Sequence, residues 1–326
     1  MFKLGIIGTG SISHEFIKAA QSTGDYQLAA VYSRTLASAE RFVQNYENTA
    51  IFTEMLDFLS SDIDVVYIAS PNSLHFNHAK VAILARKHVI VEKPAVSRPK
   101  EWRELVKLAD EHQVYLFEAA RNYLEQAFDT ISDFLKDKTV LGANFTYAKY
   151  SSKMQALLAG EQPNVFSAKF SGGALMDLGV YPVYAAIRLF GHPRFARYSA
   201  QQLANTIDLN GAGCLIYPDF QVQIQAGKNI NSNLPGEIYT DQGTLTLDGI
   251  EFISSAIWQS LDGQEEVLTI QRASHTMLEE AQAFARVLKG GQDADYEKWL
   301  NAAAAVHESL FAMRKDAGIR FEVDDD

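Results

Sequence analysis

The chain begins with a short apolar segment that runs directly into a glycine-rich turn. Residues 2–8 read Phe-Lys-Leu-Gly-Ile-Ile-Gly, which predicts a buried strand. A helix is predicted from about residue 11 to Ser22, because apolar side chains recur there at helical spacing. A strand, a tight glycine turn and a helix form a unit that can hold a phosphate at the helix N-terminus. This beginning favours an α/β fold.

Strand-like and helix-like segments alternate through the first 120 residues. Further buried strands are predicted at 27–32, 65–69, 88–91 and 114–117. Helices are predicted at 36–46, from 53, at 74–85 and at 98–112. Apolar strands separated by helices form a parallel sheet that helices cover on both faces. We therefore predict a Rossmann domain over residues 1–120.

The pattern changes after residue 120. Residues 221–226 alternate between glutamine and an apolar residue, which predicts a strand with one packed face. Other strands are predicted at 142–147 and after a turn at 240–243, and an irregular polar segment at 151–171. Helices are predicted at 125–135, 172–190, 278–288 and 297–314, and a frayed end at Asp324–Asp326. Residues 121–326 are therefore predicted to form an α+β domain with an antiparallel or mixed sheet.

Composition excludes several classes of protein. The formal net charge is −11 and no long basic run appears, which argues against nucleic acid or an anionic membrane as partner. The single cysteine, Cys214, excludes an internal disulfide and a cysteine-based metal site. No apolar stretch approaches the ~20 residues that span a bilayer, and the N-terminus lacks signal-peptide features. We therefore predict a cytoplasmic protein.

The glycine turn reads Gly8-Thr9-Gly10-Ser11-Ile12-Ser13, so Ser13 stands where the usual dinucleotide fingerprint has its third glycine. Serine is small enough for close packing of helix against strand. The first two glycines permit the tight turn and the approach of a pyrophosphate. A simple turn is the alternative, but the position directly after an apolar strand favours a dinucleotide site.

The end of the second strand is the usual place where NAD and NADP are distinguished. An NAD site has an acidic residue about 20 residues past the glycines, but here Ser33 and Arg34 follow the strand. Arg34 can pair with a 2′-phosphate while stacking on the adenine, and Ser33 can donate a hydrogen bond. The alternative is that Ser33 only caps the next helix and Arg34 lies on the surface. We predict NADP as the preferred cofactor and NAD as the second choice.

Polar residues also follow the third and fourth strands. Ser70-Pro71-Asn72 comes after the third, with His75 and His78 in the next helix. No nearby carboxylate or cysteine completes a zinc site, so His78 is predicted to lie on the helix surface. Glu92-Lys93-Pro94 ends the fourth strand. Hydride transfer from an alcohol needs a base and the reverse reaction an acid, which a partly buried lysine can supply.

Lys93 alone could be a solvated lysine at a strand end, and only its place at the same sheet edge as the glycine turn favours catalysis. In the second half, Gly172-Gly173-Ala174-Leu175-Met176-Asp177 continues to Tyr181 and Pro182. Asp177 and Tyr181 are four residues apart, so they project from one helix face. They could bind a polyol and move its proton. The alternative is a capped helix with a half-buried tyrosine.

These motifs together resemble the Gfo/Idh/MocA family over nearly the whole chain. The resemblance rests on the opening Gly-Ile-Ile-Gly-Thr-Gly, on Ser70-Pro71-Asn72 with His75, on Glu92-Lys93-Pro94 and on residues 172–182. It implies that the Rossmann domain is followed by a substrate-binding domain with a large open sheet. The outer face of that sheet would form the interface of a homodimer or higher homo-oligomer.

The resemblance also implies roles for residues. Lys93 would lie beside the nicotinamide and the substrate, and Asp177 would hold a substrate hydroxyl. Tyr181 matches the acid/base tyrosine of the dihydrodiol and NADP-xylose dehydrogenase branch, which Ser33-Arg34 also resembles. Cofactor contacts are implied for the glycine turn and for Ser70, Pro71, Asn72, His75, Glu92, Lys93 and Arg121.

Two departures leave the substrate open. Residues 118–124 lack the aromatic–Arg–Phe–x–Pro pattern of that branch, and Ser171 replaces the leading glycine of the later motif. The leading interpretation is an NADP-dependent dehydrogenase or reductase of a sugar, polyol or related carbonyl. The alternatives are a non-catalytic binder of dinucleotide and sugar, and a redox-neutral glycoside-processing enzyme that keeps its cofactor bound. Lys93, Asp177 and Tyr181 together argue against the binder, whereas the sequence does not exclude the redox-neutral enzyme.

Overall fold

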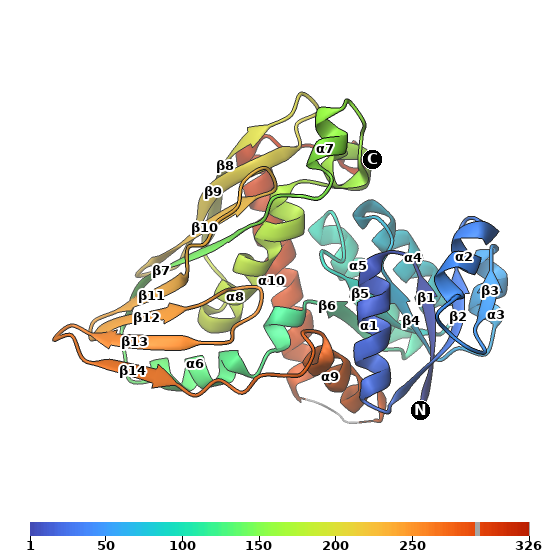
Figure 1. Cartoon of the computed structure of the whole chain (residues 1–326), viewed down its shortest axis with the longest axis horizontal. Coiled ribbons are helices and arrows are strands. Elements are labelled where there is room, and N and C mark those ends of the chain that lie inside the picture. The colour runs from blue at the N-terminus through green and yellow to red at the C-terminus, as the bar shows by residue number, and fades with distance from the viewer. Residues whose placement is uncertain (291–293, 326) are drawn as a thin grey trace. The chain divides into compact units, whose positions relative to one another are not determined.

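The protein is described by a computed structural model that covers residues 1–290 and 294–325. The chain divides into two compact units (Figure 1). The first comprises residues 1–119 and 273–300, and the second comprises 120–272 together with the residues from 301 onward. The sequence predicted a single boundary at 120, so the return of residues 273–300 to the first unit is a difference.

The first unit is built around a parallel sheet. Its strands are β1 (Phe2–Ile7), β2 (Tyr26–Tyr32), β3 (Ala50–Phe52), β4 (Val65–Ile68), β5 (His88–Glu92) and β6 (Leu116–Ala119). The helices that connect them are α1 (Ser11–Ser22), α2 (Leu36–Val43), α3 (Met55–Ser60), α4 (Asn72–Leu84) and α5 (Pro99–His112). The strand order is β3-β2-β1-β4-β5-β6 and neighbouring strands are parallel, which confirms the predicted Rossmann sheet.

The order of the strands reverses between β1 and β4, so the helices cover both faces of the sheet (Figure 1). Helix α4 packs against α5, and α1 packs against α9 (Leu278–Leu288). Strands β4 and β5 are almost wholly buried, which explains why their sequences are continuous apolar runs.

Residues 273–300 belong to the first unit because they complete its core. Phe117 in β6 stacks on Phe284 with ring centroids 4.7 Å apart, and Tyr296 meets Phe117 edge-on at 5.5 Å. The Tyr26 hydroxyl donates to the Ala281 carbonyl oxygen at 3.1 Å. Helical periodicity at 278–288 predicted helix α9 itself, but not what it packs against.

The second unit contains a mixed sheet. Its strands are β7 (Val140–Ala148), β8 (Phe195–Gln202), β9 (Asp208–Ile216), β10 (Gln221–Gly227), β11 (Gly236–Thr240), β12 (Gly243–Leu247), β13 (Ala256–Ser260) and β14 (Glu265–Leu268). Their order is β14-β13-β12-β11-β7-β10-β9-β8. Among the described residues, β7 and β10 pair in parallel and the other neighbours are antiparallel. The prediction of a large, mostly antiparallel sheet is therefore confirmed.

The other described elements of the second unit are short, apart from α6 and α8. They are η1 (Arg121–Leu124), α6 (Ala127–Leu135), α7 (Met154–Leu158), η2 (Asn164–Phe166), η3 (Ala168–Phe170), the π-helix η4 (Leu175–Gly179), α8 (Val180–Phe190) and η5 (Glu322–Asp324). Helix α10 (Ala294–Ala317) contributes residues to both units. In the described part of the chain, no helix is long and apolar enough to cross a membrane.

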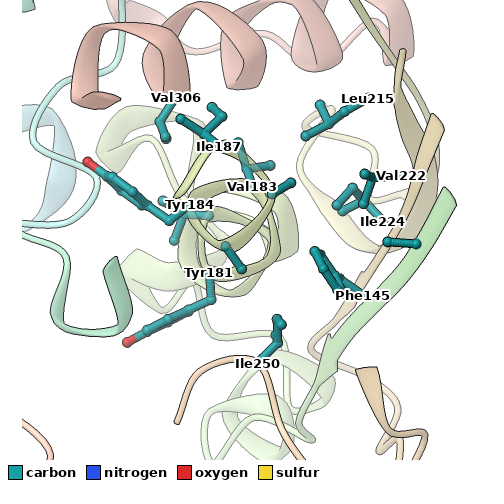
Figure 2. Packing of buried hydrophobic residues seen from close by; sticks show 14 of the residues in the cluster. Phe145, Tyr181, Val183, Tyr184, Ile187, Leu215, Val222, Ile224, Ile250 and Val306 are labelled. Carbon is teal, nitrogen blue, oxygen red and sulfur yellow. The ribbon is translucent and has the colours of Figure 1, made fainter. Parts of the chain in front are cut away.

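Helix α8 packs on the inner face of this sheet (Figure 2). Its Val183 and Ile187 face Val222 and Ile224 of β10, while the Tyr181 hydroxyl points away from the strands. Val222 and Ile224 are 0% and 1% exposed, which confirms that the apolar residues of the alternating segment share the packed face. Burying each of these side chains stabilises the fold by about 1.5–3 kcal/mol.

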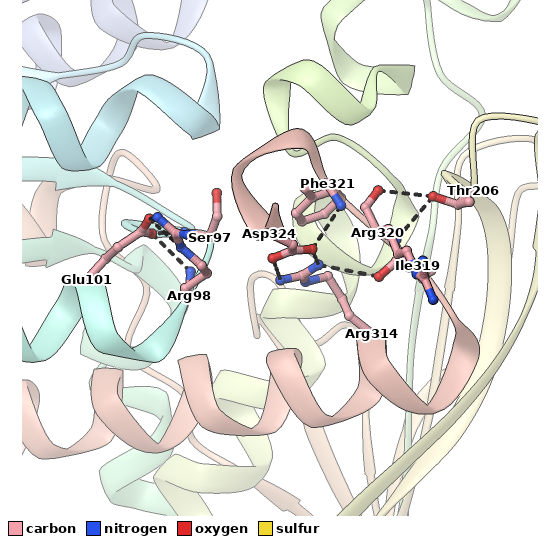
Figure 3. Close-up of polar contacts among 9 residues, drawn as sticks. All are labelled: Ser97, Arg98, Glu101, Thr206, Arg314, Ile319, Arg320, Phe321 and Asp324. Carbon is pink, nitrogen blue, oxygen red and sulfur yellow. Dashed lines mark hydrogen bonds and ion pairs between the residues drawn. The ribbon is translucent and has the colours of Figure 1, made fainter. Parts of the chain in front are cut away.

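A buried arginine anchors the C-terminal segment (Figure 3). Arg314 is 1% exposed, and its Nη1 donates to Asp324 Oδ2 at 2.8 Å. The same oxygen accepts a hydrogen bond from the Phe321 backbone N–H at 2.9 Å. The predicted frayed end is therefore wrong for Asp324, because a buried guanidinium needs a carboxylate partner. Asp326 lies outside the described residues.

We predict that Asp324→Ala lowers the free energy of unfolding by about 3 kcal/mol, because it leaves the buried Arg314 cation without its carboxylate. Asp325→Ala is the matched control, since Asp325 is exposed. Urea unfolding followed by circular dichroism measures both variants. Equal midpoints for the two would contradict the assigned role of the ion pair.

Candidate functional site

The glycine turn follows β1 at the carboxyl edge of the parallel sheet. Gly8 has φ +108°, and a Cβ atom at this position would lie 2.4 Å from the Ala69 carbonyl oxygen, so only glycine fits. Ser13 is fully buried, and its Oγ donates to the Gly8 carbonyl oxygen at 2.7 Å. The residue in the third glycine position therefore ties the start of α1 back to the turn.

Gly10 is the N-cap of α1, and no side chain caps the helix there. A Cβ atom at Gly10 would meet no heavy atom within 4 Å, so the space beside the helix start is open. The first N–H groups of a helix lack intrahelical partners and attract an anion. Thr9 is half-buried and Ser11 and Ile12 are exposed at the same place. These residues fit the phosphates of a dinucleotide.

Ser33 and Arg34 follow β2 at the same edge. The Ser33 backbone N–H donates to the Phe52 carbonyl oxygen at 3.1 Å, and Arg34 is exposed. The N-cap of α2 is Thr35, so the alternative in which Ser33 caps that helix is wrong. The positive charge of Arg34 contributes to lowering the pKa of His78.

His75 connects the loops that follow β4 and β5. It is 1% exposed, with Nε2 2.6 Å from the Ser70 carbonyl oxygen and Nδ1 3.0 Å from the Pro94 carbonyl oxygen. Burial lowers the pKa of His75, although both carbonyls oppose this effect. A neutral imidazole donates through one nitrogen only, so one of the two carbonyls receives its N–H. Pro71 and Asn72, at the start of α4, are half-buried.

His78 does not lie on the open surface, contrary to the sequence prediction. Its Nδ1 is 2.9 Å from Ser70 Oγ. Burial lowers the pKa of His78 to about 4, with smaller contributions from the charges of His75 and Arg34. The sequence held a sign that His78 is partly buried, because it lies three residues after His75 and shares a helix face with it. Among the described residues, no cluster of His, Cys, Asp or Glu could hold a metal ion.

Lys93 lies half-buried in the loop after β5. The preceding Glu92 is 7% exposed, and its carboxylate accepts a hydrogen bond from the buried Tyr67 hydroxyl at 2.5 Å. The Ala95 N–H donates to Glu118 Oε1 at 3.0 Å. Farther along, the backbone N–H groups of residues 97 and 98 donate to the Glu101 carboxylate (Figure 3). The loop that carries Lys93 is therefore fixed on several sides.

In the second unit, Asp177 lies in the π-helix η4 and Tyr181 in the first turn of α8. The sequence predicted a regular helix over 172–190, so the π-turn is a correction. A π-turn adds one residue to a helical turn and occurs frequently at functional sites. The side chain of Asp177 is 36% exposed, whereas Tyr181 is 9% exposed.

Asp208 fixes the beginning of the π-turn. Its Oδ2 accepts hydrogen bonds from the Leu175 N–H at 2.7 Å and from the Tyr198 hydroxyl at 3.1 Å. Burial raises the pKa of Asp208. Gly173 has φ +118°, and a Cβ atom there would lie 2.1 Å from Asp208 Oδ1. The sequence analysis missed Asp208, because one aspartate beside an apolar strand gives no sign of burial.

Tyr181 is held by neighbours from the same unit. Its ring meets Tyr147 edge-on with centroids 5.3 Å apart, and the guanidinium carbon of Arg121 lies 5.4 Å from its centroid. Its carbonyl oxygen accepts a hydrogen bond from Asn122 Nδ2 at 3.0 Å. Asn122, which the sequence analysis also missed, donates to the Ile250 carbonyl oxygen as well, at 3.2 Å.

Asp177 forms an ion pair with Lys228, between Oδ2 and Nζ. The side chain of Lys228 is 5% exposed. The sequence analysis missed this lysine, because the alternating pattern stops at residue 226 and a lysine at a strand end is usually solvated. Of the three predicted catalytic residues, Lys93 belongs to the first unit, whereas Asp177 and Tyr181 belong to the second.

Comparison with known proteins agrees with this architecture. The chain is 34% identical to the oxidoreductase YgjR of Escherichia coli over 99% of both chains. It is 32% identical to scyllo-inositol 2-dehydrogenase (NADP(+)) IolU of Bacillus subtilis, again over 99% of both. Its fold matches that of the 3-ketoreductase KijD10 of Actinomadura kijaniata in complex with NADP, with a TM-score of 0.81, 20% identity and 97% of each chain covered.

Residues 2–120 match the family model described as an oxidoreductase family with an NAD-binding Rossmann fold. This match lies over the strands and loops that carry the glycine turn, Ser70 and Lys93. Together with the two relatives that align over the whole chain, it confirms the resemblance found in the motifs. The chain therefore belongs to the Gfo/Idh/MocA family of oxidoreductases.

Proposed function

We propose that the protein is an NADP-dependent oxidoreductase that acts on a CH–OH group, or the corresponding carbonyl, of a cyclitol or sugar. The observation that carries this proposal is the presence of the open glycine turn and of Lys93 at one edge of the parallel sheet. The relative IolU, named as a scyllo-inositol dehydrogenase, supports a polyhydroxylated ring as substrate.

In this proposal, Asp177 and Lys93 bind and orient the substrate, and Tyr181 transfers the proton. Bound nicotinamide would accept or supply the hydride. Tyr181 exchanges the proton of the substrate oxygen, and Asp177 accepts a hydrogen bond from a substrate hydroxyl. Lys93 orients the substrate oxygen, and its loop is rigid enough for that task because Glu118 and His75 hold the adjacent backbone.

The preference for NADP rests on Ser33 and Arg34. Both follow β2, where an acidic residue would instead bind an unphosphorylated ribose. A guanidinium suits a phosphate dianion because it donates two parallel hydrogen bonds. The NADP(+) in the name of IolU and the NADP complex of KijD10 support the same cofactor.

We expect Arg34→Ala to weaken NADP⁺ binding by about 10- to 100-fold and NAD⁺ binding much less, because both cofactors share the adenine but only NADP⁺ carries the 2′-phosphate. Isothermal titration calorimetry with both dinucleotides measures the two affinities. Arg41→Ala is the matched control, because Arg41 is exposed on α2. Equal losses for the two cofactors would argue against the proposed contact.

Tyr181→Phe and Lys93→Met should each lower kcat by about 100-fold or more, because each removes a group from proton transfer or substrate orientation. The assay follows NADPH absorbance with scyllo-inositol and a panel of polyols and aldoses. The matched controls are Tyr150→Phe and Lys100→Met, at exposed positions. If either Tyr181→Phe or Lys93→Met turns over at the wild-type rate, the role given to that residue is wrong.

We also propose that a second copy of the chain covers the outer face of the sheet in the second unit. Outward-facing Phe195, Tyr239, Ile257 and Val267 are 62%, 36%, 36% and 64% exposed. Ile257 and Val267 are cross-strand neighbours, so they form one apolar area. The polar glutamines of β10 lie between them and Phe195 in the strand order.

Sedimentation velocity at micromolar concentration should give a mass of at least twice the 36.2 kDa chain. Val267→Glu should shift the protein toward monomer, because it buries a charge in the interface. Leu158→Glu is the control, since Leu158 is 68% exposed on α7 and outside the sheet. A wild-type monomer would contradict the proposal.

A further inference from the structure

Lys228 is a buried lysine that none of the roles above includes. It follows β10 directly and is 4% exposed. Its backbone N–H donates to the Leu209 carbonyl oxygen at 2.7 Å, and its carbonyl oxygen accepts from the Ser151 N–H at 2.8 Å. The position of the backbone is therefore fixed from two sides. Lysine is almost never fully buried unless its ammonium is paired.

The partner of this ammonium is the carboxylate of Asp177. The two side chains differ in exposure, because Lys228 is 5% exposed and Asp177 is 36% exposed. The lysine therefore supports the carboxylate from the interior, while the aspartate side chain also reaches the surface. A salt bridge with one end fixed in the interior limits the orientations of the other end more than an exposed pair does.

Asp177 needs such support because of where it lies. It lies in the π-helix η4, which is less regular than an α-helix. Tyr181 lies four residues later, in the first turn of α8. Asp208 holds the start of the π-turn through the Leu175 N–H, and Asn122 holds the Tyr181 carbonyl oxygen. Lys228 pairs with the carboxylate of Asp177 itself.

We propose that Lys228 is a positioning residue that aims the Asp177 carboxylate at the substrate hydroxyl next to the reacting carbon. This inference rests on the proposed function. Asp177 and Tyr181 lie one helical turn apart on one face, so a substrate oxygen at Tyr181 brings a neighbouring hydroxyl toward Asp177. The arrangement selects a neutral substrate with adjacent oxygens, because an anionic group at this position would meet a carboxylate.

The hydroxyl contact is made in the bound substrate and in the transition state alike, so its loss appears in KM rather than in kcat. Lys228→Met should raise the KM for scyllo-inositol by about 10-fold and change kcat by less than about threefold. Lys228→Arg, which keeps the charge, should stay within about threefold of wild type in both constants. Lys136→Met is the matched control, because Lys136 also pairs with an aspartate but is 74% exposed.

The double variant Asp177→Asn/Lys228→Met separates positioning from general support of the fold. If Lys228 acts through Asp177, adding Lys228→Met to Asp177→Asn raises KM by less than about twofold. A further tenfold rise in that background overturns the inference. This comparison also covers the case in which Lys228→Met alone does not fold, because the double variant leaves no unpaired carboxylate and the Asp177→Asn background keeps an amide oxygen that can accept a hydrogen bond from the Lys228 ammonium.

The outcomes distinguish this inference from the function on which it rests. A wild-type protein that turns over no polyol or aldose of the panel contradicts the proposed function. A wild-type protein that is active, with Lys228→Met unchanged in KM, contradicts only the role of Lys228. A fall in kcat with unchanged KM would also overturn it, because the residue would then act in the chemical step.

Discussion

The close approach of the backbone at Gly8 to the end of β4 is the contact on which the candidate cofactor site depends. No side chain fits between Gly8 and the Ala69 carbonyl oxygen, so β1 and β4 end side by side. Parallel neighbours end at one edge, which places the turn, Ser70 and the Lys93 loop along that edge. Ser13 adds a hydrogen bond that keeps the helix start next to the turn.

The second unit positions its candidate functional side chains with buried polar groups. Three residues from distant parts of the chain hold successive points of residues 173–181: Asp208 at the start, Lys228 in the middle and Asn122 at the end. Burying each of these three polar side chains would destabilise the fold if its partner were absent, because an unpaired polar group in the interior is costly. The packing of α8 on the sheet sets where the helix lies, and the polar contacts set the conformation of its first turns.

Local sequence patterns predicted those features of the fold that depend on residues close together in the chain. Apolar runs identified the buried strands β4 and β5, and the alternation at 221–226 identified the packed face of β10. The π-turn was not predicted, because the residue that holds its first N–H, Asp208, lies 33 residues later in the chain. Lys228 was missed for the same reason, since a lysine at a strand end reads as solvated until its partner is known. Thr35, and not Ser33, is the helix cap because it lies directly before the first residue of α2 and has an extended backbone. Sequence alone does not decide between two candidate caps that are two residues apart.

The return of residues 273–300 has a consequence for how this protein is divided. The family match ends at residue 120, yet Phe117 packs on Phe284 and the Tyr26 hydroxyl bonds to Ala281. A fragment cut at residue 120 would keep every residue that the family model matches but lose part of its own interior, leaving aromatic faces in water. The segment that the family model matches is thus shorter than the set of residues that must fold together, because that set also includes residues 273–300. Exchanging the second unit between relatives would require three junctions, at 119/120, 272/273 and 300/301.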